Sequence, residues 1–117
     1  NYLPVLGPAI DSGLVKALAH ITGGGLPENL PRVLPAGIDA HIELGSWPIP
    51  PLFRLVREVA VGMATAELYR TLNMGVGMVI VCAASDAEDV RALVPEQTWV
   101  IGGLVTTDGP GREVVLR

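Results

Sequence analysis

Three consecutive glycines, Gly23, Gly24 and Gly25, form the centre of the stretch with the strongest chemical signal. An apolar run at 14–21 precedes them, and a short helix is expected at 27–34. Glycines lack a Cβ, so such a turn can adopt positive φ and approach a ligand closely. Backbone N–H groups that converge between a strand and a helix start can hold an anion. A tight connection without a ligand fits the same spacing, which leaves both interpretations open.

Polar side chains flank this turn. His20 lies near the end of the apolar run, where its imidazole could serve as an acid, a base or a phosphate ligand. Thr22 and Asn29 can donate hydrogen bonds to an anion. The structural alternatives are a packing role for His20, and turn stabilisation or capping for Thr22 and Asn29.

A second polar cluster surrounds two further glycines, Gly75 and Gly77. Thr71 and Asn73 precede them at the end of an expected helix, and an apolar strand at 79–82 follows. In a chain with so little charge, this cluster indicates the wall of a site. A bulge or close packing at the glycines is the structural alternative.

Composition limits the classes of protein. The 117 residues suffice for one domain with a core. Only 17% are charged, which indicates that another domain or subunit covers part of the surface. The net charge of −4 argues against a nucleic-acid partner. The single cysteine, Cys82, favours a cytoplasmic setting. The longest apolar run, at 74–84, is too short for a bilayer, and the two histidines and one cysteine form no metal motif.

The periodic patterns predict an α/β domain, with helices packed on one mixed sheet of about four to five strands. Strands are expected at 15–22, 38–44, 79–82, 98–105 and 112–116. Helical segments are expected at 2–10 as one or two broken turns, at 27–34 as a short or partly 3₁₀ helix, and at 51–61, 64–72 and 85–94. Ser85 is the expected N-cap of the last helix. The strand at 79–82 is expected at the centre of the sheet, and 108–111 as a hairpin turn between the last two strands.

Two long segments carry a resemblance to a known enzyme family. Residues 20–35, HITGGGLPENLPRVLP, resemble a signature of the aminoimidazole ribonucleotide synthetases, also called phosphoribosylformylglycinamidine cyclo-ligases. Residues 67–78, ELYRTLNMGVGM, resemble a second, with Trp47 and Pro48 between them in the expected order. The resemblance covers essentially the whole chain but only the C-terminal domain of that family. Leu68 is a departure, since members often have Met there.

The resemblance implies that residues 1–117 are the single C-terminal domain of a two-domain enzyme. The N-terminal nucleotide-binding domain, which would bind most of the ATP and Mg²⁺, is absent from this chain. Members cyclise formylglycinamidine ribonucleotide to aminoimidazole ribonucleotide with ATP hydrolysis, in purine biosynthesis. The full-length protein would be a cytoplasmic homodimer without nucleic-acid or membrane partners, and the isolated C-terminal domain would be inactive.

The resemblance also implies roles for the two glycine motifs. His20 is the expected catalytic residue, as an acid, a base or a stabiliser of the phosphoryl group. The residues expected to bind substrate or phosphate are Thr22, Gly23, Gly24, Gly25, Asn29, Thr71, Asn73, Gly75 and Gly77. These residues would form two walls of a cleft that faces the missing domain, and none of them is a metal ligand.

Two other interpretations stay open. Selenophosphate synthetases, thiamine-monophosphate kinases and hydrogenase-maturation proteins belong to the same superfamily and share the fold, although both long motifs together are not expected in them. A free-standing anion-binding or interaction module without catalysis is the other. The sparse charge of the chain argues against a solitary module.

Overall fold

The computed structural model describes residues 3–49, 51 and 75–117. The elements within this part of the chain are α1 (Leu3–Asp11), β1 (Val15–His20), α2 (Gly25–Asn29), the 3₁₀ helix η1 (Leu30–Val33), β2 (Ile38–Ile42), β3 (Met78–Cys82), the 3₁₀ helix η2 (Ala84–Asp86), α5 (Ala87–Leu93), β4 (Gly102–Thr106) and β5 (Val114–Leu116). The expected α/β class is confirmed. The helices expected at 51–61 and 64–72 fall almost entirely outside the described residues.

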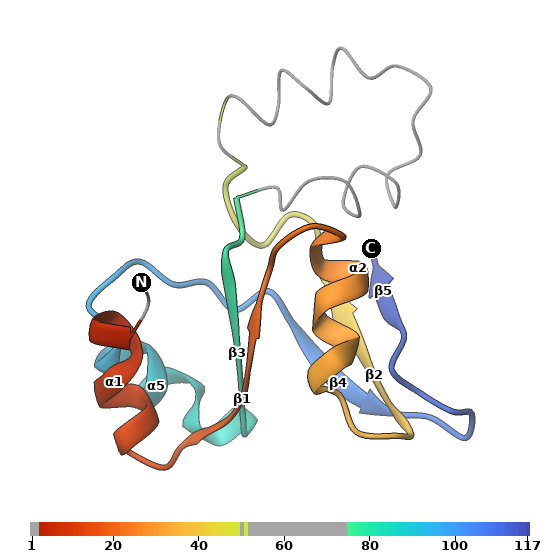
Figure 1. Ribbon diagram of the computed structural model, residues 1–117, viewed down its shortest axis with the longest axis horizontal. Coiled ribbons are helices and arrows are strands. Elements are labelled where there is room, and N and C mark those ends of the chain that lie inside the picture. Colours follow the sequence, from red (N-terminus) through yellow and green to blue (C-terminus); the bar gives the residue numbers. More distant parts are fainter. Residues whose placement is uncertain (1–2, 50, 52–74) are drawn as a thin grey trace.

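The strands of the described residues are divided between two sheets (Figure 1). β1 and β3 form an antiparallel ribbon in which His20 lies opposite Met78. In the second sheet β2 lies between an antiparallel β4 and a parallel β5. Figure 1 shows the ribbon between two groups of elements, with α1 and α5 on one side and α2 and the second sheet on the other.

The expected hairpin between the last two strands is wrong, because β4 and β5 lie on opposite sides of β2. Their connection passes around the start of β2. Gly37 accepts a hydrogen bond from the N–H of Thr107 at 2.9 Å and donates its own N–H to the carbonyl of Pro110 at 2.8 Å. Arg112 donates its N–H to the carbonyl of Ile38 at 2.6 Å. In this arrangement both edges of β2 are paired, which a hairpin between β4 and β5 would not achieve.

The ribbon carries apolar side chains on both faces, which explains the all-apolar run at 79–82. Ala19 and Val79 join a core cluster with residues of α2, η1 and β2. Leu18 and Ile80, their neighbours along the strands, point to the other face and pack against α1 and α5. Among the described strands β3 pairs with β1 alone, so its expected place at the centre of a sheet is wrong.

Local signals predict the ends of elements only in part, and β4 begins at Gly102, four residues after the start of the strand expected at 98–105. α1 continues through Pro8, so the expected break is wrong, and the N–H of Ser12 donates to the carbonyl of Pro8 at 3.1 Å. α5 begins after a 3₁₀ turn that contains Ser85, and its N-cap is Asp86 without a side-chain hydrogen bond. The helix expected at 27–34 is indeed short and partly 3₁₀. No helix within the described ranges is long and apolar enough to cross a bilayer.

Candidate functional site

The three glycines form the turn between β1 and α2. Gly24 has φ +93° and Gly25 has φ +61°, both in the left-handed region that favours glycine. A Cβ on Gly24 would meet Oε2 of the Glu28 carboxylate and lie 2.6 Å from the Cβ of Glu28, so no side chain fits there without moving α2. Gly23 has no positive φ, and a Cβ at this position would meet no atom within 4 Å. The backbone therefore requires glycine at Gly24, favours it at Gly25 and leaves Gly23 unexplained.

Asn29 organises this turn from the inside. It is the one buried polar residue among those described, with 3% of its surface exposed. Its amide nitrogen lies 3.2 Å from the carbonyl oxygen of Thr22, 3.1 Å from that of Gly23 and 2.8 Å from that of Gly25. Its Oδ1 accepts a hydrogen bond from the Thr22 hydroxyl at 3.2 Å. The amide donors of Asn29 are thus engaged within the turn and do not face a ligand.

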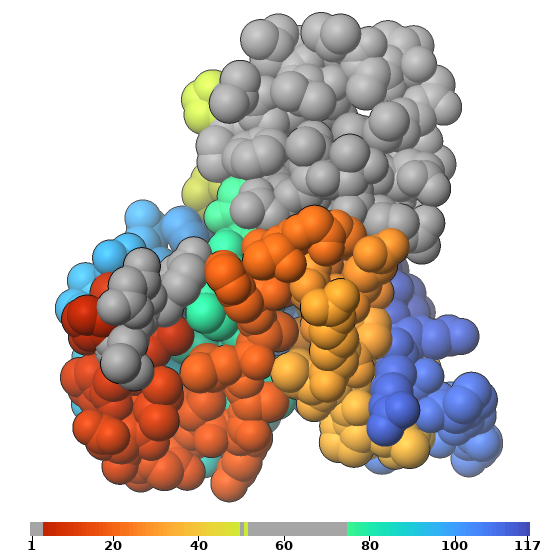
Figure 2. Space-filling view, in the orientation of Figure 1, coloured from red at the N-terminus to blue at the C-terminus, as the bar shows by residue number. Residues whose placement is uncertain are grey.

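These contacts fix the direction of the peptide groups in the turn. In a trans peptide the C=O and the following N–H point in opposite directions, and the described residues contain no cis bond. The carbonyls of Thr22 and Gly23 point toward Asn29, so the N–H groups of Gly23 and Gly24 point away from it. Neither N–H donates a hydrogen bond to another described residue. Gly23 is exposed, and the segment with the turn and α2 (orange) lies at the surface in Figure 2.

Backbone pairing brings the second glycine motif to the first. The N–H of Ile21 donates to the carbonyl of Gly77 at 3.0 Å, directly after the last pair of the ribbon. Gly75, two residues earlier, has φ +92°. Thr71 and Asn73, the other two residues expected on this wall, lie outside the described residues.

His20 and Thr22 are both exposed at this end of the ribbon. Alternation along β1 puts His20 on the face that carries Leu18, opposite to the face of Ala19 that packs beneath α2. The structure therefore gathers His20, Thr22, the three glycines, Asn29 and Gly77 at one end of the β1–β3 ribbon.

A cavity of about 860 Å³ lies between the two sheets, and the sequence did not predict it. β3 and residues 75–77 line one side of it, and β2 and the start of β4 line another. α5, residues 96–101, Trp47 and parts of α1 and η1 complete it. None of residues 22–29 contributes to its lining. The sequence offered one sign of it, the adjacent apolar residues Trp99 and Val100, which line the cavity. In the structure they are 40% and 55% exposed. The cavity therefore does not include the turn at 23–25, but it reaches the second glycine motif at Gly75 and Gly77.

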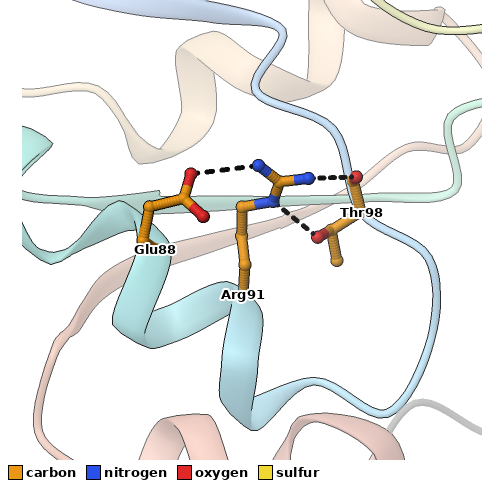
Figure 3. A network of polar contacts seen from close by, with 3 residues as sticks. All are labelled: Glu88, Arg91 and Thr98. Carbon is orange, nitrogen blue, oxygen red and sulfur yellow. Dashed lines mark hydrogen bonds and ion pairs between the residues drawn. The ribbon is translucent and has the colours of Figure 1, made fainter.

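Arg91 of α5 fixes one wall of this cavity (Figure 3). Its Nε donates to the hydroxyl of Thr98, and its Nη2 donates to the carbonyl of the same residue, both at 3.0 Å. Its Nη1 pairs with Glu88 at 3.0 Å, where the Glu88 side chain is 80% exposed. Solvent screens so exposed an ion pair, and the two bonds to Thr98 hold the wall in place.

The described residues bring no three His, Cys, Asp or Glu side chains together in a way that could hold a metal ion. The single cysteine, Cys82, lies in β3. Burial raises the pKa of its thiol, and the nearby Asp86 carboxylate adds to this effect.

Fold and site together define an α/β domain whose glycine turn joins the exposed end of a two-stranded ribbon to a short helix. The family described as AIR synthase related protein, C-terminal domain, matches residues 2–115. The chain belongs to this family, and the resemblance seen in the two long motifs is confirmed.

Relatives of known name support this assignment. The chain is 40% identical over 111 residues to the phosphoribosylformylglycinamidine cyclo-ligase of Shouchella clausii, covering 92% of this chain and 32% of the relative. It is 50% identical over 91 residues to the enzyme of the same name from Methylobacillus flagellatus, covering 75% and 26%. The chain thus spans about a third or less of the length of these curated relatives.

A solved structure with the same fold is the hydrogenase maturation protein HypE of E. coli. It superposes with a TM-score of 0.69 at 26% identity and covers 98% of this chain and 35% of that one. The fold is therefore shared between proteins whose names indicate different activities.

Proposed function

We propose that this chain is the C-terminal domain of a two-domain, ATP-dependent cyclo-ligase that converts formylglycinamidine ribonucleotide to aminoimidazole ribonucleotide in purine biosynthesis. The observation that carries the proposal is the 40% and 50% identity to named cyclo-ligases over most of the chain. A hydrogenase-maturation role is the second candidate, favoured by the HypE fold, but its support is 26% identity.

In the proposed reaction ATP phosphorylates the formyl oxygen of the substrate. The amidine-side nitrogen of the same molecule then attacks that carbon and displaces phosphate, which closes the imidazole ring. Phosphorylation converts a poor leaving oxygen into a good one. The task of the protein is therefore mainly to position the reacting groups and to stabilise charge.

We assign ATP and Mg²⁺ mainly to the N-terminal domain that the longer relatives would supply. The full-length protein in this proposal is a cytoplasmic homodimer, and its N-terminal domain is the partner that this domain faces across the cleft.

The contribution of this domain is proposed to be the wall built on the glycine turn. Gly23 and Gly24 direct their N–H groups outward, where they can donate to phosphate oxygens. His20 serves beside them as an acid, a base or a stabiliser of the phosphoryl group. Gly25 shapes the turn, Thr22 holds the amide of Asn29 through its hydroxyl, and the second wall consists of Thr71, Asn73, Gly75 and Gly77.

The division between domains is tested by assaying the 117-residue chain alone. It should show no ATP-dependent cyclisation, and addition of the N-terminal domain of the enzyme should restore it. Turnover by the chain alone would contradict the two-domain proposal.

The binding role of the turn is tested by Gly23→Ala in the full-length enzyme. The added methyl meets no atom within 4 Å, so the domain should fold normally with an unchanged thermal midpoint. It would obstruct a phosphate that approaches the N–H, so KM for the ribonucleotide should rise roughly tenfold or more. Gly45→Ala is the matched control, because Gly45 also has open space and no positive φ. An unchanged KM in Gly23→Ala would rule out close approach of the substrate to this turn.

A further inference from the structure

We infer that Asn29 is a positioning residue for the glycine turn: it sets the direction of the backbone N–H groups and does not itself bind substrate. The inference rests on the proposed function, since the ligand of the turn is the phosphate of the proposed substrate. It assigns Asn29 a different role from that implied by the family resemblance, which placed it among the binding residues.

The first argument is the freedom of the turn. Glycine can adopt the φ values of this turn without strain, but for the same reason it can leave them easily. The contacts of Asn29 reach Thr22, Gly23 and Gly25, which lie on both sides of Gly24. One buried side chain therefore restrains every peptide group whose direction decides what the turn presents.

The second argument is electrostatic. Asn29 draws three carbonyl oxygens to the inner side of the turn, so their negative ends face away from an approaching anion. The carboxylate of Glu28, which lies beside Gly24, opposes an anion, so the direction of the peptide groups matters the more. Rotation of the peptide between Gly23 and Gly24 would replace an outward N–H by an outward carbonyl oxygen. The turn would then repel the phosphate that it is proposed to bind.

The third argument concerns the orientation of the amide itself. The Thr22 hydroxyl donates to Oδ1 of Asn29, which leaves the nitrogen to face the carbonyls. An aspartate at position 29 would have no donor at all for these carbonyls and would add a negative charge. Asn29→Asp should therefore be more damaging than Asn29→Ala, although it is nearly isosteric.

The kinetic test uses the full-length enzyme with three variants, Asn29→Ala, Asn29→Asp and Asn29→Ser. The alanine variant should lose at least tenfold in kcat/KM for formylglycinamidine ribonucleotide, aspartate more, and serine less because its hydroxyl keeps one donor. Ser12→Ala is the matched control. The Ser12 hydroxyl also donates a hydrogen bond to a backbone carbonyl, that of Ala9. Ser12 lies at the other end of β1 from the glycine turn, so loss of its hydroxyl should leave kcat/KM unchanged.

The second readout is independent of turnover. In the 117-residue chain labelled with ¹⁵N-glycine, inorganic phosphate should shift the amide signals of Gly23 and Gly24, and Asn29→Ala and Asn29→Ser should abolish or weaken that shift. A merely structural role would lower the thermal midpoint without removing the phosphate response. The inference is overturned if the folded variants keep the shifts and keep kcat/KM within twofold of wild type. If the wild-type enzyme shows no cyclisation, the proposed function fails, whereas the phosphate response still decides the role of Asn29.

Discussion

The turn at 22–25 contains two glycines with left-handed φ and the loop at 107–113 contains one, Gly111, but different groups hold the two segments in place. In the turn, the side chain of Asn29 takes up the carbonyl groups and leaves two N–H groups directed outward. In the loop, the backbone at the start of β2 exchanges hydrogen bonds with the loop, through Gly37 among others. The loop thus completes a sheet, whereas the turn leaves the N–H groups of Gly23 and Gly24 available to a ligand.

The comparison shows that glycine content alone does not locate a binding site. What matters is which backbone groups remain after the fold has used the others. Substitution of Gly23, the turn position with room for a side chain, should therefore affect activity more than stability, and substitution of Gly111 in the loop should do the reverse.

The largest effect is expected at His20, beside the turn. His20→Ala in the full-length enzyme should lower kcat by roughly 10²- to 10⁴-fold, the usual contribution of general acid–base catalysis. Because His20 is exposed, the thermal midpoint should change little. Unchanged turnover would show instead that His20 only packs.

The largest effect on stability is expected at Gly111 in the loop. Its φ is +76°, and a Cβ would lie 2.4 Å from the nitrogen of Ile38 and 2.5 Å from that of Gly37. Gly111→Ala should cost about 2–4 kcal/mol in the free energy of unfolding, because backbone atoms cannot yield as a flexible side chain can. Gly109→Ala is the control within the same loop. The atom nearest its Cβ is 3.8 Å away, so urea unfolding should detect a change of at most about 0.5 kcal/mol.

A smaller effect is expected at Arg112, which has φ +63° and donates its Nε to the carbonyl of Leu34 at 2.9 Å. Arg112→Ala loses this bond and keeps the unfavourable φ, so it should cost about 1–2 kcal/mol. Arg112→Gly loses the same bond but relieves about 1 kcal/mol of backbone strain, so it should be milder. Urea unfolding of both variants checks the order, and a milder alanine variant would contradict it.

The smallest effect concerns Cys82, which lies outside both regions and serves as a probe of them. Its raised pKa keeps the thiol protonated, so alkylation near pH 8 should be slower than for a free thiol. Asp86→Asn removes the lesser cause of the shift and should accelerate alkylation slightly. Gly111→Ala should accelerate alkylation by exposing β3 on unfolding, whereas His20→Ala should not. Equal alkylation rates in Gly111→Ala and His20→Ala would contradict the expectation that the loop supports stability and the turn supports activity.

Much of the fold could be predicted from local patterns. The alternation at 38–44 indicated a half-buried strand, and Ala40 and Ile42 of β2 are indeed buried. The proline at 31 indicated a helix that is partly 3₁₀, as found. Such features depend on neighbours within a few residues, and the sequence displays those neighbours directly.

The pairing of strands could not be predicted in the same way. The turn residues at 108–111 have the same local chemistry whether the flanking strands pair with each other or with β2 between them. The all-apolar segment 79–82 likewise indicates that both faces of this strand are covered, but it does not indicate which elements cover them.

The candidate site likewise has one part that the sequence predicted and one part that it could not. The glycine turn was located from its sequence and His20 was found beside it. The inward direction of Asn29 could not be predicted, because residue type defines the donors and acceptors of a side chain but not where they point.

The position of β2 within its sheet also has a consequence for biosynthesis. The carboxylate of Asp39 accepts a hydrogen bond from the N–H of Glu113, 74 positions later, and the bond between Leu34 and Arg112 spans 78. A nascent chain that has not reached residue 102 carries β2 without either of its strand partners. Contacts so distant in sequence close slowly, and an unpaired strand can pair with another chain. For this domain, the interval between translation of β2 and release of β5 is therefore the period of greatest exposure to misassembly.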